Sequence, residues 1–260
     1  MTAFSRYIGI DYSGAQTPTA SLKGLRVYVA RGADMAVEEP PFPPSPRKYW
    51  TRRGLAEWLV LTLRESPPTL VGIDHGFSFP SAYFQKHKIS GGWSGFLDDF
   101  CAHWPTGEDH MYVEFVRDGM YGSGAARQGK ANWRRLPEQR VGAKSVFHFD
   151  VQGAVAKSTH AGLPWLRFLR QSLGQAVHFW PFDGWVPRSG VHVVAEVYPA
   201  LWRGCYPVEG RTPDQQDAYS ASRWLQEADR EGKLKQFFDP PLAADERVTA
   251  EVEGWILGVR

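Results

Sequence analysis

Short apolar runs closed by polar or turn residues recur along the chain and predict buried strands. The runs at residues 6–10 and 70–73 are apolar at nearly every position, whereas residues 25–30 alternate. Such runs are typical of sheets covered by helices on both faces. The predicted strands are residues 6–10, 25–30, 35–38, 70–73 and 191–197.

Other segments repeat their apolar residues at helical spacing. Thr51 is a candidate N-cap for the first of these helices, and Pro67 and Pro68 stop it. Thr212, followed by Pro213 and by Gln215 three residues on, has the pattern of a capping box. The predicted helices are residues 51–65, 213–229 and 245–257.

The alternation of buried strands with helices indicates an α/β fold. We expect one domain over residues 1–260, with a core of about residues 1–75 and 191–260. Between them lies an insertion of about residues 76–190, rich in Gly, Trp and basic residues. A proline-rich stretch at residues 38–49 is expected to be a loop.

Composition narrows the class of protein. With 260 residues the chain can bury a core without disulfides, and its net charge of +2 makes it neither a polycation nor an acidic tail protein. Two cysteines without metal-ligand spacing favour a reducing compartment. There is no signal-peptide core and no apolar run near the length that crosses a bilayer. We therefore expect a soluble cytoplasmic protein without membrane contact.

Acidic residues stand where several predicted strands end. Asp11 closes the first strand, Asp74 closes the fourth, and Glu196 lies within the last. Asp214 and Asp217, three residues apart, project from one face of the helix at 213–229. Because an unpaired carboxylate is costly to bury, and because ligands bind at the carboxyl ends of strands, we expect these acids to converge at one sheet edge.

Converging carboxylates repel one another unless a cation joins them. Oxygen-rich sites suit Mg²⁺ or Mn²⁺, and two such ions can promote phosphoryl displacement. The sequence therefore predicts a two-ion site in which Asp11, Asp74, Glu196 and Asp217 are catalytic. Asp214 is expected to be a further or alternate metal ligand. The alternative is that the single acids are turn or capping residues.

A basic segment at residues 117–144 holds seven Lys and Arg against two acids. Cations neutralise phosphates and aromatic faces stack bases, so the segment is a candidate nucleic-acid surface. It is equally consistent with a solvated loop. The candidate contact residues are Arg127, Lys130, Trp133, Arg134 and Arg135.

These motifs as a set resemble the ribonuclease H-like superfamily. "YIGIDYSG" resembles its first-strand motif, "LVGIDHGFSFP" its fourth-strand motif and "DQQDAYSA" its late helix motif. More closely, "KSVFHFD", "AGLPWLRFLR", "WPFDGW", "EVYPALW" and "EGWILG" resemble an uncharacterised domain-of-unknown-function family of predicted nucleases. The resemblance implies a mixed sheet flanked by helices, an insertion between the fourth and fifth core strands, and hydrolysis of DNA or RNA.

Two other functions remain open. "GIDYSG" also resembles the first phosphate loop of actin-like and sugar-kinase-like phosphotransferases, which would imply ATP as a substrate. A non-catalytic nucleic-acid-binding module could keep the same fold. The sequence carries no signal for an oligomeric state.

Overall fold

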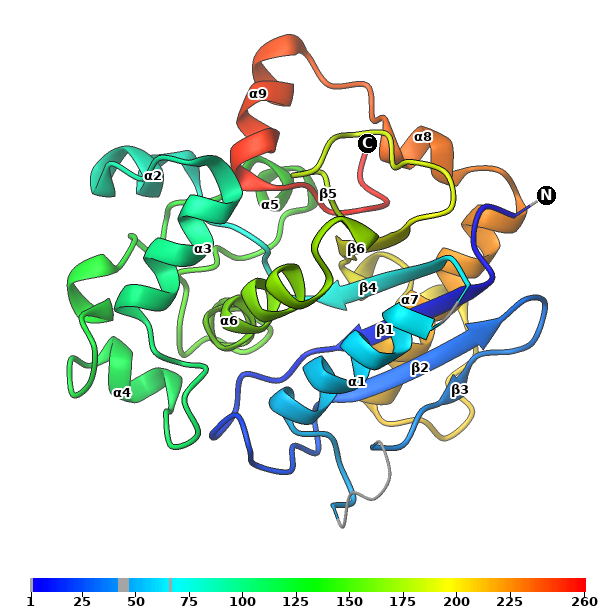
Figure 1. Cartoon of the computed structure of the whole chain (residues 1–260), viewed down its shortest axis with the longest axis horizontal. Helices are drawn as coiled ribbons and strands as arrows, with labels where there is room; N and C mark the ends of the chain where they lie inside the picture. Colours follow the sequence, from blue (N-terminus) through cyan, green and yellow to red (C-terminus); the bar gives the residue numbers. More distant parts are fainter. Residues whose placement is uncertain (1, 42–46, 66) are drawn as a thin grey trace.

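Figure 1 shows the computed structural model of the chain, which describes residues 2–41, 47–65 and 67–260. A six-stranded sheet has the order β3-β2-β1-β4-β6-β5. β1, β2 and β3 are antiparallel, whereas β1–β4, β4–β6 and β6–β5 are parallel pairs. The strands are β1 (Arg6–Asp11), β2 (Arg26–Arg31), β3 (Val37–Glu38), β4 (Thr69–Asp74), β5 (Val177–Trp180) and β6 (His192–Glu196).

Helices cover both faces of this mixed sheet, so the α/β class is confirmed. α1 and α6 lie on one face, and α7 lies on the other (Figure 1). The arrow of β4 points toward the side of the molecule that carries α2, α3 and α4 (Figure 1). The helices are α1 (Arg52–Glu65), α2 (Ser81–His87), α3 (Gly92–His103), α4 (Val113–Arg117), α5 (Leu136–Val141), α6 (Ala156–Leu173), α7 (Pro213–Arg230), α8 (Leu234–Phe238) and α9 (Ala244–Glu253).

Alternation along β1 divides the core into two layers. Ile8 and Ile10 are fully buried in the layer that includes α1 and α6. Tyr7 is fully buried in the opposite layer, with α7 and the C-terminal segment. Because successive side chains of a strand point to opposite faces, a strand buried on both faces must be apolar throughout. This explains the continuous apolar run at the start of the chain.

α7 lies unusually close to β1 because Gly9 has no side chain. A Cβ atom on Gly9 would lie 2.2 Å from the carbonyl oxygen of Ala218 and 2.4 Å from the amide nitrogen of Ser222. The hydroxyl of Ser222 donates to the carbonyl of Tyr7 at 3.0 Å. Helix and strand backbones are therefore in direct contact, and this contact fixes where the first turns of α7 lie.

All five predicted strands are present, and the predicted helix starts are confirmed. The amide of Gly54 donates to the hydroxyl of Thr51 at 2.9 Å, so Thr51 caps α1, which ends at Glu65. Thr212 and Gln215 form the expected capping box at the start of α7. The third strand is shorter than predicted, because only residues from Val37 pair with β2.

Two elements differ from the sequence prediction. β5 lies within the predicted insertion and pairs with β6, so the insertion contributes an edge strand to the sheet. The last helix stops at Glu253 instead of continuing to residue 257, because Gly254 has a φ of 78°. Ile256 then forms a parallel bridge with Glu196, and the amide of Leu257 donates to the Glu196 carbonyl at 2.9 Å. Residues 254–257 therefore pair with β6 instead of continuing the helix that their sequence pattern predicts.

The proline-rich stretch is only partly within the described residues, since residues 42–46 lie outside them. The remaining residues of the stretch, apart from the start in β3, are not in a helix or strand. Among the helices that the structure describes, none combines the length and the apolar character needed to cross a bilayer.

Gly9→Ala is expected to lower the free energy of unfolding by about 1–3 kcal/mol, because the added methyl group would meet backbone atoms that cannot rotate away. Urea unfolding measures the loss. Gly204→Ala is the matched control, since no atom of the described residues lies within 4 Å of its added Cβ and its φ is not positive. Equal stability of the two variants would contradict the close approach of α7.

Candidate active site

The register of the parallel strands places Asp11 directly beside Asp74. The last residues of β1 and β4 are Cα partners, as are Gly9 and Gly72 two positions earlier. Both aspartates are partly buried. Within the described residues, neither carboxylate has a hydrogen bond or an ion pair, so the two negative side chains lie next to each other without a directly bonded cation.

Glu196 is on the next strand but on the opposite face. Its Cα partner is Ile73, not Asp74. Since partners across a sheet share a face, Glu196 points to the face of Ile73, away from that of Asp74. Its carboxylate accepts a hydrogen bond from the amide of Phe77 at 3.0 Å. Glu196 therefore lies at the same end of the sheet as Asp74 but on the opposite face.

α7 supplies the acids on the face of Asp11 and Asp74. Asp214 lies in its first turn and Asp217 in its second, where the close contact with β1 holds the helix against the sheet. Asp217 is buried, and its two carboxylate oxygens accept hydrogen bonds from the guanidinium of Arg203. Arg203 begins the short 3₁₀ helix Arg203–Cys205, which follows the loop after β6.

The electrostatics show that these acids form one group. Burial, followed by the charges of Asp74, Asp217 and Asp214, raises the pKa of Asp11 well above its usual value. Burial, followed by the charges of Asp217 and Glu196, likewise raises the pKa of Asp74. Arg203 opposes both increases. Carboxylates in this setting hold protons more tightly or attract a cation.

Arg203 and Tyr198 are site residues that the sequence analysis did not identify. Hydrogen bonding to Asp217 raises the pKa of Arg203, and the charges of Asp11 and Asp74 add to this. Burial, and then the charge of Asp74, raises the pKa of Tyr198. Both residues follow Glu196 closely in the chain, and their place in a loop after an acid-bearing strand is the one signal that could have indicated them.

Arg135 belongs to a buried ion-pair network and not to the surface. It is 1% exposed, and its guanidinium donates to Glu196 at 2.6 and 2.8 Å and to Glu138 at 2.8 Å. The two carboxylates raise the pKa of Arg135 against the effect of burial. The expectation that Arg135 contacts nucleic acid is not met in this structure, because both sides of its guanidinium are already bonded and buried.

A small hollow of about 20 Å³ joins the two groups of acids. Asp74, Glu196 and Arg135 line it, together with Lys144 and Tyr198. A space of this size holds about one water molecule, and its polar walls could bind it. It is the point at which a small polar occupant would contact acids from both faces of the sheet.

The donor atoms suit a hard divalent cation only in part. Carboxylate oxygens of Asp11 and Asp74 are the ligands that Mg²⁺ and Mn²⁺ prefer, and neither carboxylate is bonded to a cation from the described residues. Over residues 2–41, 47–65 and 67–260, however, no three His, Cys, Asp or Glu side chains are grouped as a ready metal site. Asp217 and Glu196 are instead each paired with an arginine. Asp217 would have to leave Arg203 to complete such a site.

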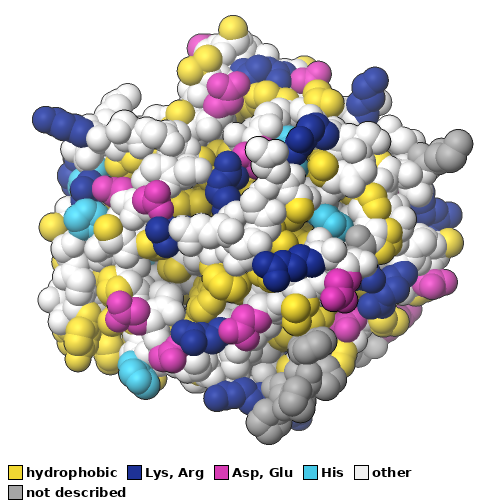
Figure 2. All heavy atoms as spheres, viewed as in Figure 1, with side chains coloured by type: hydrophobic (Ala, Val, Ile, Leu, Met, Phe, Trp, Pro, Cys, Tyr) yellow, Lys and Arg dark blue, Asp and Glu magenta, His cyan; other side chains and the backbone are white. Residues whose placement is uncertain are grey.

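Two of the other candidate nucleic-acid residues are bonded within the protein, and two lie side by side. Arg127 pairs with Asp99 at 2.9 Å, and Arg134 donates to the Glu138 carbonyl at 2.9 Å. The ammonium groups of Lys130 and Lys86 lie 5.8 and 5.7 Å from the ring centre of Trp133. Figure 2 shows Lys and Arg side chains dispersed among acidic ones on the face it presents, with no continuous basic patch there.

Comparisons of the chain with protein-family models, with curated proteins and with solved structures found no match. The resemblance to the ribonuclease H-like superfamily therefore stays a prediction. The geometry of the carboxylate site is the basis on which a function can be proposed.

Asp74→Asn is expected to stabilise the protein at pH 7.5 in EDTA. The raised pKa means that the folded state binds the Asp74 proton more tightly than the unfolded chain, so stability falls as the pH rises above about 4. Asparagine cannot ionise, so it removes this loss of stability. Each 1 kcal/mol added to the free energy of unfolding raises Tm by about 2–4 °C. Thermal unfolding between pH 4 and 8, near the pKa of a free aspartate and above it, should show a gain that shrinks toward the acid end.

The exposed Asp34 provides the control, because Asp34→Asn removes the same charge from a solvated position. It should leave Tm unchanged. A lower Tm for Asp74→Asn than for the wild type at pH 7.5 would contradict the repulsion among these acids.

Arg135→Met is expected to lower the free energy of unfolding by about 3–5 kcal/mol, because Glu138 and Glu196 would stay buried without a cation. Adding Glu196→Gln should recover part of the loss. Arg167→Met breaks an exposed pair with Asp98 and should cost less than about 1 kcal/mol. Urea unfolding of the four proteins gives the comparison, and a loss no larger than that of Arg167→Met would exclude a structural role for the network.

Proposed function

We propose that the chain is a Mg²⁺- or Mn²⁺-dependent phosphodiesterase that cleaves nucleic acid, with a ribonuclease H-like fold. The meander of β1, β2 and β3, followed by α1 and the parallel strands β4 and β6, is the order that the resemblance implies. A late helix, α7, brings further acids to the first and fourth strands. This agreement of topology and acid positions supports the proposal.

One observation carries the proposal most directly: Asp11 and Asp74 are Cα partners on parallel strands, and in the part of the chain that the structure describes neither has a cation bonded to it. A structure that needed these residues only for folding would gain stability by pairing or replacing them. Two adjacent, partly buried carboxylates that repel each other are instead typical of sites that bind a cation.

In this proposal, Asp11, Asp74 and Asp217 would hold the cations, with Asp214 at the outer side. Bound divalent cations would share the negative charge, polarise a phosphoryl oxygen and lower the pKa of a bound water. Asp217 would then need Arg203 less, and the half-exposed side chain of Arg203 would be able to bind a phosphate oxygen. The side chain of Arg203 is 52% exposed, so this movement requires no unpacking.

Glu196 has a different part in the proposal from the one its sequence position indicated. Arg135 and the amide of Phe77 occupy both of its oxygens. We propose that it positions the segment after β4, and so Asp74, while its charge contributes to the raised pKa of Asp74. Direct ligation by Glu196 would require Arg135 to rotate out of a fully packed site.

The surface near Trp133 is the basis for proposing nucleic acid as the substrate. Lys86 and Lys130 lie over or beside its ring, and a hollow of about 460 Å³ is lined by Asn132, Trp133 and Arg134. Aromatic faces stack bases and lysines neutralise phosphates, so this hollow suits a single-stranded or splayed nucleotide.

Cys101 and Cys205 are both free thiols. Free thiols are usual in proteins of reducing compartments. This supports a cytoplasmic setting as part of the same proposal.

A second candidate is a non-catalytic nucleic-acid-binding module. The pairing of Asp217 with Arg203 and of Glu196 with Arg135 favours it, because both acids have a cation from the protein itself. The two candidates differ in one measurable property, since only the nuclease needs to bind a divalent cation at Asp11 and Asp74.

Purified protein is expected to bind Mn²⁺ and to cleave at least one substrate among single-stranded, duplex and branched DNA and RNA. Asp11→Asn should reduce cleavage to about 1% or less, because it removes charge that stabilises the reaction. It should also weaken Mn²⁺ binding, as measured by calorimetry. Asp34→Asn should match the wild type in both assays.

The outcomes separate the candidates. Nucleic-acid binding without Mn²⁺ binding would favour the non-catalytic module. Equal cleavage by the wild type and Asp11→Asn would rule out the proposed site. Tight binding of Mg-ATP by calorimetry would favour the phosphotransferase alternative.

A further inference from the structure

A separate cavity of about 710 Å³ lies at the end of the sheet opposite to the carboxylates, where β1 and β6 begin. Phe4, just before β1, and Val191, just before β6, belong to its wall, so it lies at the amino ends of these strands. Asp11 and Glu196 are at their carboxyl ends. The cavity is therefore distinct from the candidate active site, and none of the acids discussed above lines it.

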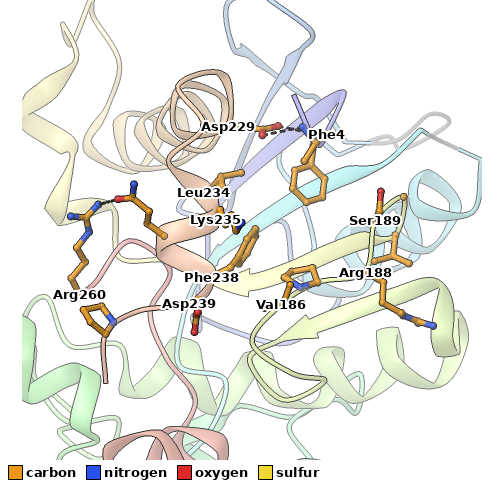
Figure 3. A pocket seen from close by; sticks show the side chains of 17 residues that line it. Phe4, Val186, Arg188, Ser189, Asp229, Leu234, Lys235, Phe238, Asp239 and Arg260 are labelled. Atoms are coloured by element: carbon orange, nitrogen blue, oxygen red, sulfur yellow. Dashed lines mark hydrogen bonds between the residues drawn. The ribbon is translucent and has the colours of Figure 1, made fainter. Parts of the chain in front are cut away.

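The floor of this cavity is apolar and well buried. Phe4, Leu234 and Phe238 are 6%, 4% and 7% exposed and belong to the same core layer as α7. Val186 stands at the mouth and is 71% exposed. Figure 3 shows these side chains around one hollow, with Leu234, Lys235 and Phe238 coming from α8 and Val186 from the segment between β5 and β6. Volume and floor are those of cavities that bind small organic molecules.

The two acids in the wall already have partners within the protein. Asp229 accepts hydrogen bonds from the amides of Ala3 and Phe4 at 3.0 and 2.9 Å and from the hydroxyl of Tyr7 at 2.7 Å. Asp239 pairs with Arg247 at 2.8 Å. Neither carboxylate is left to attract a cationic ligand.

The three cations of the wall have no acidic partner among the described residues. Arg188 donates to the carbonyl of Gln175 at 3.1 Å, and Arg260 donates to the side chain of Gln236 at 2.6 Å. Lys235 has no hydrogen bond or ion pair within the described part of the chain. Figure 3 shows Arg188 and Arg260 on opposite sides of the hollow, with Lys235 between them. An anion beside Lys235 would be its first bonded partner among the described residues.

From the apolar floor and the unpaired cations together we infer that this cavity binds a small organic anion with an apolar body, such as an acyl or aryl carboxylate. The apolar part would rest on Phe4 and Phe238, and the charged end would lie at the mouth near Lys235. Burial of the apolar part supplies affinity, whereas the cations select for charge. The inference does not depend on the proposed nuclease activity.

The test uses 1-anilinonaphthalene-8-sulfonate as the probe, because it combines an aromatic body with one negative charge. The full chain should show saturable fluorescence at one site. Octanoate should displace the probe, whereas neutral 1-octanol at the same concentration should not. Lys235→Glu should weaken probe binding by at least about fivefold, since it places like charges together.

Matched variants control for effects of charge on probe binding that do not depend on the cavity. Lys233→Glu makes the same change two residues away, outside the cavity wall, at an exposed side chain paired with Glu231. Val186→Glu changes an exposed residue at the mouth, and Val208→Glu changes a comparably exposed valine outside the wall. Lys235→Glu and Val186→Glu should weaken binding, while the two controls should bind as the wild type does.

Thermal unfolding of each variant checks that the probe reports the folded protein. Val186 is so exposed that its variant tests the site even if Lys235→Glu fails to fold. Absence of saturable binding, equal displacement by 1-octanol, or wild-type affinity in Val186→Glu would each overturn the inference.

Discussion

The parallel pairing of β1 with β4 is the contact on which the rest of the structure depends. It aligns Gly9 with Gly72 and Asp11 with Asp74 on one face of the sheet. The glycines leave a shallow trough: a Cβ on Gly72 would lie 2.7 Å from Val197, and one on Gly9 would meet the backbone of α7. The helix can therefore approach closely enough to bring Asp217 to the two aspartates. The pairing of β1 with β4 thus causes both the close packing of α7 and the repulsion between Asp11 and Asp74.

Two arginines pair with acids at this end of the sheet, one on each face, and of the two only Arg203 opposes the raised pKa values of Asp11 and Asp74. Arg203 bonds Asp217 on the face of α7 and is half exposed. Arg135 bonds Glu196 on the opposite face and is buried. Arg203 can exchange partners because its own side chain is half exposed, whereas the buried pair of Arg135 and Glu196 is costly to break. In the proposed nuclease, Arg203 is the arginine that can respond to a cation or a phosphate, and Arg135 holds Glu196 in place.

α7 connects this edge with the opposite one. Asp217 lies near its start and Asp229 near its end, about 18 Å away along the helix axis. Asp229 holds the backbone of Ala3 and Phe4, so the helix also fixes the segment that enters β1. One helix thus positions both the carboxylate site and the wall of the apolar cavity, while the two sites stay separated by the length of the sheet.

Local patterns in the sequence determined the core strands, the capped starts of α1 and α7, and the positions of Asp11 and Asp74 at strand ends. These features depend on neighbouring residues, so they can be predicted without knowing what packs against them. The tertiary structure alone decided the face of Glu196, the burial of Arg135 and the pairing of the last residues with β6. Register between strands and ion pairs between distant segments depend on contacts that no local pattern encodes. A basic segment can therefore look like a surface for phosphate while one of its arginines serves the core.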